Sequence, residues 1–151
     1  MYLAHSCMSN EKKDSSQQPL ILVVEDHEDS LLLISYALEL LGCGFICQKD
    51  SSSTLLVAKE YQPDLIMLDI LLPSLSGLDV VRSLKQEPLT CKIPVVAVTA
   101  LTGEEEQKNI LATGFDDYIS KPYMLEDLET MIYRFLNPKF GSKLAFETCQ
   151  E

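Results

Sequence analysis

The chain has 151 residues, of which 46% are hydrophobic and 23% charged, so it can fill the core of one domain and lacks the composition of a disordered protein. Its formal net charge of −11 argues against direct binding to nucleic acid, because Lys and Arg are what neutralise phosphates. No apolar run approaches the roughly 20 residues of a membrane span, and the N-terminus lacks the basic start of a signal peptide. We therefore expect no membrane insertion and a cytoplasmic location.

The predicted strands are short apolar runs that alternate with segments of helical periodicity. Residues 1–19 precede them and end in a polar stretch, which predicts a disordered N-terminal tail. In chain order, the expected strands cover 20–24, 45–50, 64–68, 93–98 and 115–119.

The predicted helices follow these strands and carry apolar residues three or four positions apart. We expect the first to contain Leu31, Ile34, Leu38 and Leu41 and to be closed by Gly42 and Gly44, and the second to be capped within 51–54 and stopped by Pro63. The third contains Leu78, Val81 and Leu84, and the fourth has a capping box of Thr102 and Glu105, an apolar face with Ile110 and Leu111, and a stop at Gly114. The last contains Leu125, Leu128, Met131, Ile132 and Phe135 and ends before Pro138.

This alternation predicts a single α/β domain over 20–137, followed by a C-terminal tail over 138–151. Strand–helix–strand units of this kind form a doubly wound parallel sheet with helices on both faces. The first, third and fourth runs are uninterrupted apolar, as central strands are, and the second and fifth are more polar. We therefore expect the strand order 2-1-3-4-5 of the flavodoxin-like (βα)5 arrangement.

The cysteines and histidines show no pattern of their own. The 5 cysteines are odd in number and have no CxxC spacing, which argues against a disulfide framework or a metal site built on them. Cys43 and Cys47 are expected near the core as small apolar residues. His5 and His27 stand alone in the sequence, so we expect exposed or locally hydrogen-bonded histidines rather than metal ligands.

Polar residues that can carry chemistry follow four of the predicted strands. Glu25 and Asp26 come after the first strand and Asp69 after the third. Thr99 and Lys121 follow the fourth and the fifth. The carboxyl ends of parallel strands meet at one edge of the sheet, where ligands bind in this architecture. Clustered carboxylates suit Mg²⁺, and a carboxylate can attack phosphorus to form an aspartyl phosphate.

Each of these residues also has an ordinary structural interpretation. An Asp after a strand often begins a turn, and Glu25 and Asp26 could simply cap the first helix. Thr99 could lie in a turn and Lys121 could be a solvated charge. The functional interpretation depends on four strands ending in residues that serve one reaction.

Four segments of the chain resemble the receiver domains of bacterial two-component response regulators, over residues 20–136. The segments are VVEDHEDS, LIMLDILLPSLSGLDV, IPVVAVTAL and GFDDYISKPY. The resemblance implies that Asp69 accepts a phosphoryl group from the phosphohistidine of a sensor histidine kinase or of a histidine phosphotransfer protein. It implies Mg²⁺ (or Mn²⁺) bound by Asp26, Asp69 and the backbone carbonyl of Leu71, with Glu25 acting through water.

The same resemblance implies a switch. Thr99 and Tyr118 match the pair whose hydroxyl and aromatic ring move on phosphorylation, and Lys121 matches the lysine that contacts the phosphate. The bond between Lys121 and Pro122 matches a peptide bond that is usually cis in the family. The face expected to change covers roughly 102–136, which in the family binds partners and allows a homodimer.

Four positions depart from, or vary within, the family pattern. Glu25 stands where Asp is commoner, and Leu72 where Met is common. Leu71 and Leu101 lie two residues beyond the acceptor and the threonine, at positions that influence phosphoryl lifetime. Neither apolar side chain can orient an attacking water, so we predict slow self-hydrolysis of the aspartyl phosphate.

Three functions remain to be compared. The first is a phosphorylation switch without an output domain, expected because only about fifteen residues follow Leu136. Its output would then pass to an unknown downstream protein. The second is a phosphohydrolase, an enzyme class that wants an acid where Leu71 stands. The third is an inert binding module, which the presence of Asp69 and Lys121 argues against. We expect the switch, and no turnover enzyme.

Overall fold

A five-stranded parallel sheet forms the centre of the computed structural model, which describes residues 18–72, 74–100 and 103–140. The strand order is β2-β1-β3-β4-β5, as predicted, so β2 and β5 are the edges. The strands are β1 (Leu20–Val24), β2 (Gly44–Gln48), β3 (Leu65–Asp69), β4 (Val95–Thr99) and β5 (Asp117–Ser120).

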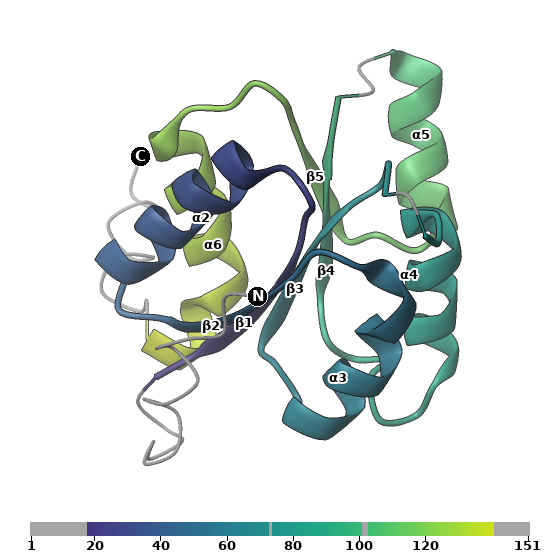
Figure 1. The fold of residues 1–151 in the computed structure, drawn as a ribbon, viewed down its shortest axis with the longest axis horizontal. Helices are drawn as coiled ribbons and strands as arrows, with labels where there is room; N and C mark the ends of the chain where they lie inside the picture. The colour runs from purple at the N-terminus through teal and green to yellow at the C-terminus, as the bar shows by residue number, and fades with distance from the viewer. Residues whose placement is uncertain (1–17, 73, 101–102, 141–151) are drawn as a thin grey trace.

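Helices cover both faces of this sheet, which confirms the doubly wound arrangement (Figure 1). Helices α2 and α6 pack together on one face, and α3, α4 and α5 form a row on the other. The helices are α2 (Glu28–Leu40), α3 (Thr54–Tyr61), α4 (Gly77–Gln86), α5 (Glu104–Thr113) and α6 (Leu125–Phe140), with a short 3-10 turn η1 (Ser51–Ser53) before α3.

The core consists of two apolar clusters, one on each face of the sheet. Alternate residues of one strand enter different clusters: Ile21 of β1 packs with α2 and α6, and Leu22 packs on the opposite side. All five residues of β1, β3 and β4 are buried, which explains why these strands are apolar up to the polar Asp69 and Thr99 that end β3 and β4. Cys43 and Cys47 are buried in the first cluster, as expected.

Two helix boundaries in the first half of the domain differ in part from the prediction. Gly42 ends α2 with a φ of 74°, as predicted, but Gly44 is the first residue of β2 and takes no part in the helix end. Helix α3 has Ser53 as its N-cap, within the predicted range 51–54, but the Ser53 hydroxyl makes no capping hydrogen bond. The 3-10 turn η1 before it is capped by Asp50, whose ionised carboxylate is a stronger acceptor than a hydroxyl and accepts from the backbone N–H of Ser52.

The last two helices also differ from the prediction. Helix α5 has Gly103 as its N-cap, and the expected capping residue Thr102 lies outside the described residues. Leu111 is 46% exposed, whereas Ile110 is buried, so the apolar face is narrower than predicted. Helix α6 continues to Phe140, through Pro138. A proline close to the end of a helix removes one donor while few hydrogen bonds remain beyond it, so the helix tolerates it there.

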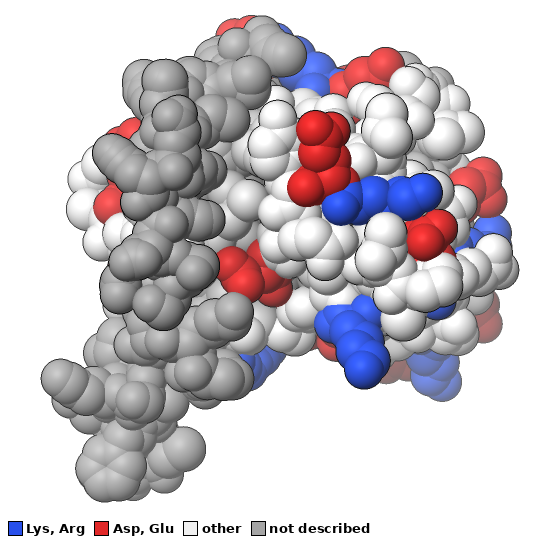
Figure 2. Space-filling model, turned by 90° about the horizontal axis from the view of Figure 1, so that it is seen from below, with Lys and Arg blue, Asp and Glu red and all other residues white. Residues whose placement is uncertain are grey.

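Charged side chains are dispersed over the described part of one face of the molecule (Figure 2). On the face that Figure 2 shows, the described Lys and Arg side chains are separated from one another by acidic and uncharged surface. Ion pairs join separate parts of the fold, among them Lys59 with Glu87, Lys85 with Asp116, and Arg134 of α6 with Asp117 of β5. None of the described helices combines the length and the apolar composition that crossing a membrane requires.

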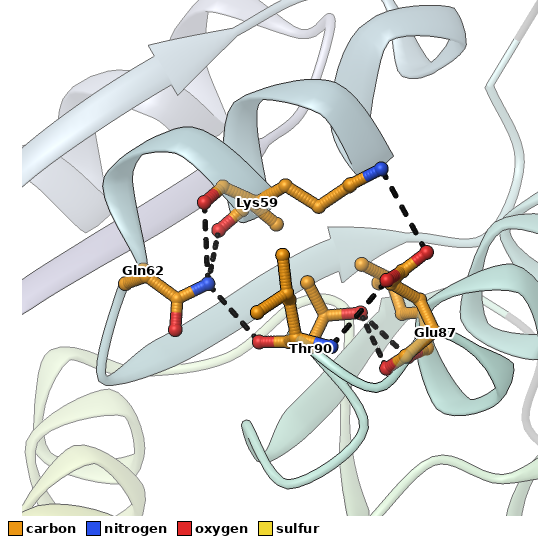
Figure 3. A network of polar contacts seen from close by, with 7 residues as sticks. Lys59, Gln62, Glu87 and Thr90 are labelled. Carbon is orange, nitrogen blue, oxygen red and sulfur yellow. Dashed lines mark hydrogen bonds and ion pairs between the residues drawn. The ribbon is translucent and has the colours of Figure 1, made fainter.

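A polar network holds the end of α3 against the loop between α4 and β4 (Figure 3). Gln62 ends the helix in the left-handed conformation, with a φ of 49°. Its side-chain amide donates to the carbonyl of Leu89 at 3.0 Å, and the ammonium group of Lys59 lies 3.7 Å from the carboxylate of Glu87. The buried hydroxyl of Thr90 donates to the carbonyl of Leu84 at 2.7 Å. These contacts fix the position of α3 relative to the loop between α4 and β4.

Candidate functional site

The strand register brings the predicted site residues to one edge of the sheet. Asp69, the last residue of β3, is paired with Val98 of β4, and Thr99 follows at the end of β4. Thr99 is in turn paired with Ser120, and its carbonyl accepts a hydrogen bond from the backbone N–H of Lys121 at 2.8 Å. Glu25 directly follows β1. Chain segments that are far apart in sequence therefore place their polar side chains together.

Lys121 joins two carboxylates at this edge. Its ammonium nitrogen lies 3.4 Å from Oδ2 of Asp69 and 3.3 Å from Oε1 of Glu25. Asp69 is only 5% exposed and Glu25 only 1%. One cation thus contacts two buried acids, which leaves an excess of negative charge in a region of low dielectric constant.

The pKa values reflect this shared charge. Burial, followed by the negative charge of Asp69, raises the pKa of Glu25 above its ordinary value. Burial acts to lower the pKa of Lys121, but the charges of Asp69 and Glu25 outweigh it and raise that pKa. The ammonium group of Lys121 is therefore held in its charged form, whereas the ionised form of Glu25 is disfavoured. A bound cation would favour the ionised form of Glu25.

The side chains next to Glu25 fit a divalent cation. One ligand-capable atom each from Glu25, Asp26 and His27 lies within 4.8 Å of the other two. Oε1 of Glu25 is buried, and no hydrogen bond reaches it from the described residues, although Lys121 lies beside it. Carboxylate oxygens are the donors that Mg²⁺ and Mn²⁺ prefer. His27 is exposed and locally hydrogen-bonded, as expected, with its backbone N–H donating to Glu25, and its side chain lies beside those of the two acids.

The carboxylate of Asp69 is held at both of its oxygens. The backbone N–H of Leu71 donates to Oδ1 at 3.0 Å, and Lys121 contacts Oδ2. The side chain of Leu71 itself is 59% exposed, whereas Leu72 is buried and packs in the second core cluster. Leu101, the other position expected to influence phosphoryl lifetime, lies outside the described residues.

A pair of residues that sequence reasoning missed restrains the loop after Asp69. The hydroxyl of Ser51 donates to the carbonyl of Leu75 at 2.8 Å and accepts from the N–H of the same residue at 2.9 Å. Beside it, the hydroxyl of Ser74 donates to the carboxylate of Asp50 at 2.7 Å. These hydrogen bonds join two loops 24 residues apart, and no local sequence pattern reports such a contact.

The two residues predicted to form a switch occupy different environments. Thr99 is fully buried at the end of β4. Tyr118 of β5 is paired with Ala97 and partly buried against the second core cluster. The peptide bond between Lys121 and Pro122 is cis, as expected.

Replacing Glu25 tests the electrostatics of the site. In buffer containing EDTA at neutral pH, Glu25→Gln should raise the free energy of unfolding by about 1 kcal/mol, because it removes a buried charge beside Asp69 while Lys121 keeps a partner. The pKa of Glu25 is raised in the folded state, so its contribution to stability is present below its ordinary pKa and is lost as the pH rises through the raised value. The difference between variant and wild type should therefore shrink on acidification.

Chemical denaturation at several pH values measures this difference. Glu28→Gln is the matched control, because Glu28 is exposed and its pKa is lowered by the hydrogen bond and charge of Lys49. The control should give no stabilisation. A Glu25→Gln variant that is less stable than wild type at neutral pH would contradict the electrostatic interpretation.

Comparison with known proteins agrees with this geometry. The family model described as "Response regulator receiver domain" matches residues 21–133. The chain is 38% identical over 120 residues to the phosphate regulon transcriptional regulatory protein PhoB of Rhizobium meliloti, covering 78% of this chain and 52% of that protein. It is 40% identical over 112 residues to PhoB of Escherichia coli, covering 74% of this chain and 49% of that one. The chain thus spans about half the length of these curated relatives.

Two solved structures share the fold and hold a metal ion. The receiver domain of the sensor histidine kinase PA1611 from Pseudomonas aeruginosa, with a magnesium ion coordinated in its active site cleft, has a TM-score of 0.73 and 27% identity, covering 80% of this chain and 98% of that one. The Mn²⁺-bound form of the response regulator Rcp1 has a TM-score of 0.66 and 27% identity, covering 79% of this chain and 92% of that one.

Proposed function

Since the chain belongs to the response regulator receiver domain family, we propose that Asp69 accepts a phosphoryl group and that its phosphorylation switches the conformation of this domain. The observation that carries the proposal is the contact of Lys121 with both Asp69 and the buried Glu25. Phosphoryl transfer to a carboxylate needs positive charge beside it, which Lys121 supplies here, and a second acid nearby can help to hold a metal ion.

The proposed reaction is an in-line displacement at phosphorus. A carboxylate oxygen of Asp69 forms an O–P bond while the N–P bond of a phosphohistidine breaks, and the imidazole nitrogen keeps the bonding electron pair. Lys121 lies close enough to offset negative charge on the phosphoryl oxygens. A divalent cation, Mg²⁺ or Mn²⁺, held by Asp26 and Asp69 with the carbonyl of Leu71, and with Glu25 acting through water, would supply the remaining positive charge.

The donor that we propose is a sensor histidine kinase or a histidine phosphotransfer protein, and the readout is a changed protein-binding face. Thr99 would donate its hydroxyl to the phosphoryl group, and Tyr118 would follow. Beside Tyr118, a cavity of about 540 Å³ lies between β5 and α6, and its lining includes Ser120, Thr130 and Arg134. A change at Tyr118 would therefore alter a surface that has room for a partner's side chains.

A phosphohydrolase is the second candidate function, and the site gives it less support. Such an enzyme needs an acid or base that activates water near the aspartyl phosphate. Leu71 offers an apolar side chain where that acid is wanted, and Glu25, the acid that does lie beside Asp69, is buried and contacts Lys121. We therefore propose a switch that is phosphorylated once per cycle rather than a turnover enzyme.

Incubation of the protein with Mg²⁺ and a small phosphodonor separates the candidates. A stoichiometric mass gain of one phosphoryl group supports the switch. Continuous consumption of the donor beyond one equivalent supports the phosphohydrolase, and no mass gain supports an inert module. The same measurement with a phosphorylated histidine phosphotransfer protein as donor tests the proposed partner class.

Leu71 sets the expected lifetime of the phosphorylated form. The variant Leu71→Asn should lose its phosphoryl group several-fold faster than wild type, because an amide at this exposed position can orient water by hydrogen bonding and leucine cannot. The decay of the phosphorylated mass after removal of the donor measures both rates. The variant Leu75→Asn serves as control, since Leu75 is also exposed but lies further along the same loop. Equal or slower decay in Leu71→Asn would refute the idea.

A further inference from the structure

His27 lies where it could contribute to the metal site, although its position in sequence predicts no such role. It follows Asp26 and is the N-cap residue of α2, with an extended backbone (φ −85°, ψ 122°). Its backbone N–H donates to Oε2 of Glu25 at 3.1 Å, which draws the turn back over that carboxylate. Its side chain is exposed and makes no hydrogen bond that caps the helix. The imidazole is thus left to contact a ligand from solvent.

The distances among the three side chains suit one ion. Two atoms that share a divalent ion lie within about twice the metal–ligand distance of each other, roughly 4–5 Å. The ligand-capable atoms of Glu25, Asp26 and His27 all lie within 4.8 Å of one another, inside that limit. This spacing alone would be weak evidence, because surface acids often lie close together.

A second observation points to a cation at the same place. Glu25 is 1% exposed, and its Oε1 is buried without a hydrogen bond from the described residues. A buried carboxylate oxygen normally accepts hydrogen bonds, and in the described part of the chain its cationic neighbour is the ammonium group of Lys121, which Asp69 shares. A metal ion bound by Asp26 and His27 would give Oε1 of Glu25 a further positively charged partner.

We propose that His27 is a nitrogen ligand of this site and directs it toward divalent first-row transition ions in preference to Mg²⁺. The inference rests on the metal site of the proposed function and specifies its ligand set. Imidazole suits ions such as Co²⁺, Ni²⁺ and Zn²⁺, whereas Mg²⁺ strongly prefers oxygen. With His27 bound, the site offers one nitrogen beside carboxylate oxygens. Such a mixed set raises affinity for transition ions much more than affinity for Mg²⁺.

Pulsed electron paramagnetic resonance of the Mn²⁺-loaded full chain, prepared without a histidine tag, tests the ligand directly. We expect a nitrogen hyperfine coupling from imidazole in wild type that disappears in His27→Ala. The variant His5→Ala is the matched control, since the chain has 2 histidines, and it should keep the coupling. A wild-type spectrum without nitrogen coupling, or a coupling that survives in His27→Ala, overturns the proposal.

Titration calorimetry with Ni²⁺ and Mg²⁺ tests the selectivity. His27→Ala should weaken Ni²⁺ binding at least about tenfold, because even indirect partners of metal ligands contribute about 10–100-fold to affinity. Mg²⁺ binding should change by less than about twofold. Equal losses for both ions would overturn the selectivity. The proposed function is judged separately on the wild-type chain: if that chain gains no phosphoryl group from a small phosphodonor and Mg²⁺, the result counts against the phosphoryl-acceptor proposal and not against the ligand role of His27.

Discussion

The variant Asp69→Asn should gain no phosphoryl group from a small phosphodonor and Mg²⁺, whereas wild type gains one. The amide keeps the shape of the side chain and can still accept the hydrogen bond from Leu71, but it cannot form a stable aspartyl phosphate. Lys121 and the neighbouring acids stay in place, so the fold should be retained. Intact-protein mass spectrometry before and after incubation measures the gain.

The variant Asp79→Asn controls for the change of charge. Asp79 is exposed on α4 and pairs with Arg82, so the same substitution there leaves the site untouched and should leave the mass gain intact. A phosphoryl group that still appears in Asp69→Asn would place the acceptor on another side chain. A gain lost in both variants would show that net charge, and not the acceptor, controls the reaction.

The switch itself needs a structural readout on the same samples. Backbone amide resonances of Thr99 and Tyr118 should shift on phosphorylation, because both are proposed to respond to the phosphoryl group. Resonances of Gln62 and Thr90 should stay near their positions, because these residues lie in the polar network between α3 and the α4–β4 loop (Figure 3). Phosphorylation without shifts at Tyr118 would leave Asp69 as the acceptor and remove the proposed output.

The second large effect is expected at Gly77, the first residue of α4. A Cβ atom there would lie 2.7 Å from Cα of Ile70 and 3.0 Å from the carbonyl oxygen of Asp69. Both neighbours are backbone atoms of the acceptor strand and its loop, and the N–H of Gly77 also donates to the carbonyl of Ile70 at 3.0 Å. The backbone at Gly77 therefore passes too close to Asp69 and Ile70 to leave room for a side chain. Any residue other than glycine at this position would push the backbone of Asp69 and Ile70 away.

We expect Gly77→Ala to lower the free energy of unfolding by about 2–3 kcal/mol, since overpacking against backbone cannot relax by a rotamer change. In the interior of a helix, alanine is more favourable than glycine by about 0.5–1 kcal/mol. We expect the cost of the clash to be larger than this gain, so that the net effect is destabilising. Displacement of the loop should in addition slow phosphorylation of Asp69. Urea denaturation and the initial rate of mass gain measure the two effects.

Gly103→Ala is the control, because Gly103 also begins a helix. Its added Cβ would meet only the end of the Glu106 side chain, which can rotate away. This variant should lose at most about 1 kcal/mol, as an N-cap change does, and should be phosphorylated at the wild-type rate. Equal losses in the two variants would mean that the helix start, and not the approach to Asp69, makes Gly77 sensitive.

The strand order and most of the site could be predicted because they depend on local sequence. Uninterrupted apolar runs identify strands buried on both faces, and the more polar edges follow from the same argument. Glu25, Asp69, Thr99 and Lys121 each lie at or directly after the end of a strand. Once the strands are parallel, their carboxyl ends share one edge, so the convergence of these residues follows from topology alone.

Helix ends were predicted less well, for a different reason. A cap depends on which acceptor reaches the free N–H groups, and Asp50 reaches Ser52 while the serine hydroxyls serve other contacts. The exposure of Leu111 depends on how α5 is rotated against β5 and α4. These outcomes are decided by competition among neighbouring side chains, which periodicity does not describe.

The sequence by itself determined the doubly wound sheet and the placement of Asp69 and Lys121 at one edge of it, because these follow from strand runs and strand ends. Only the tertiary structure decided that Lys121 contacts Asp69 and Glu25 together, that Ser51 holds Leu75, and that His27 lies beside two acids. The direction of a side chain at a strand-to-helix turn depends on backbone angles and on hydrogen bonds such as that from His27 to Glu25. Contacts between loops far apart in the chain depend on the packed sheet that brings them together.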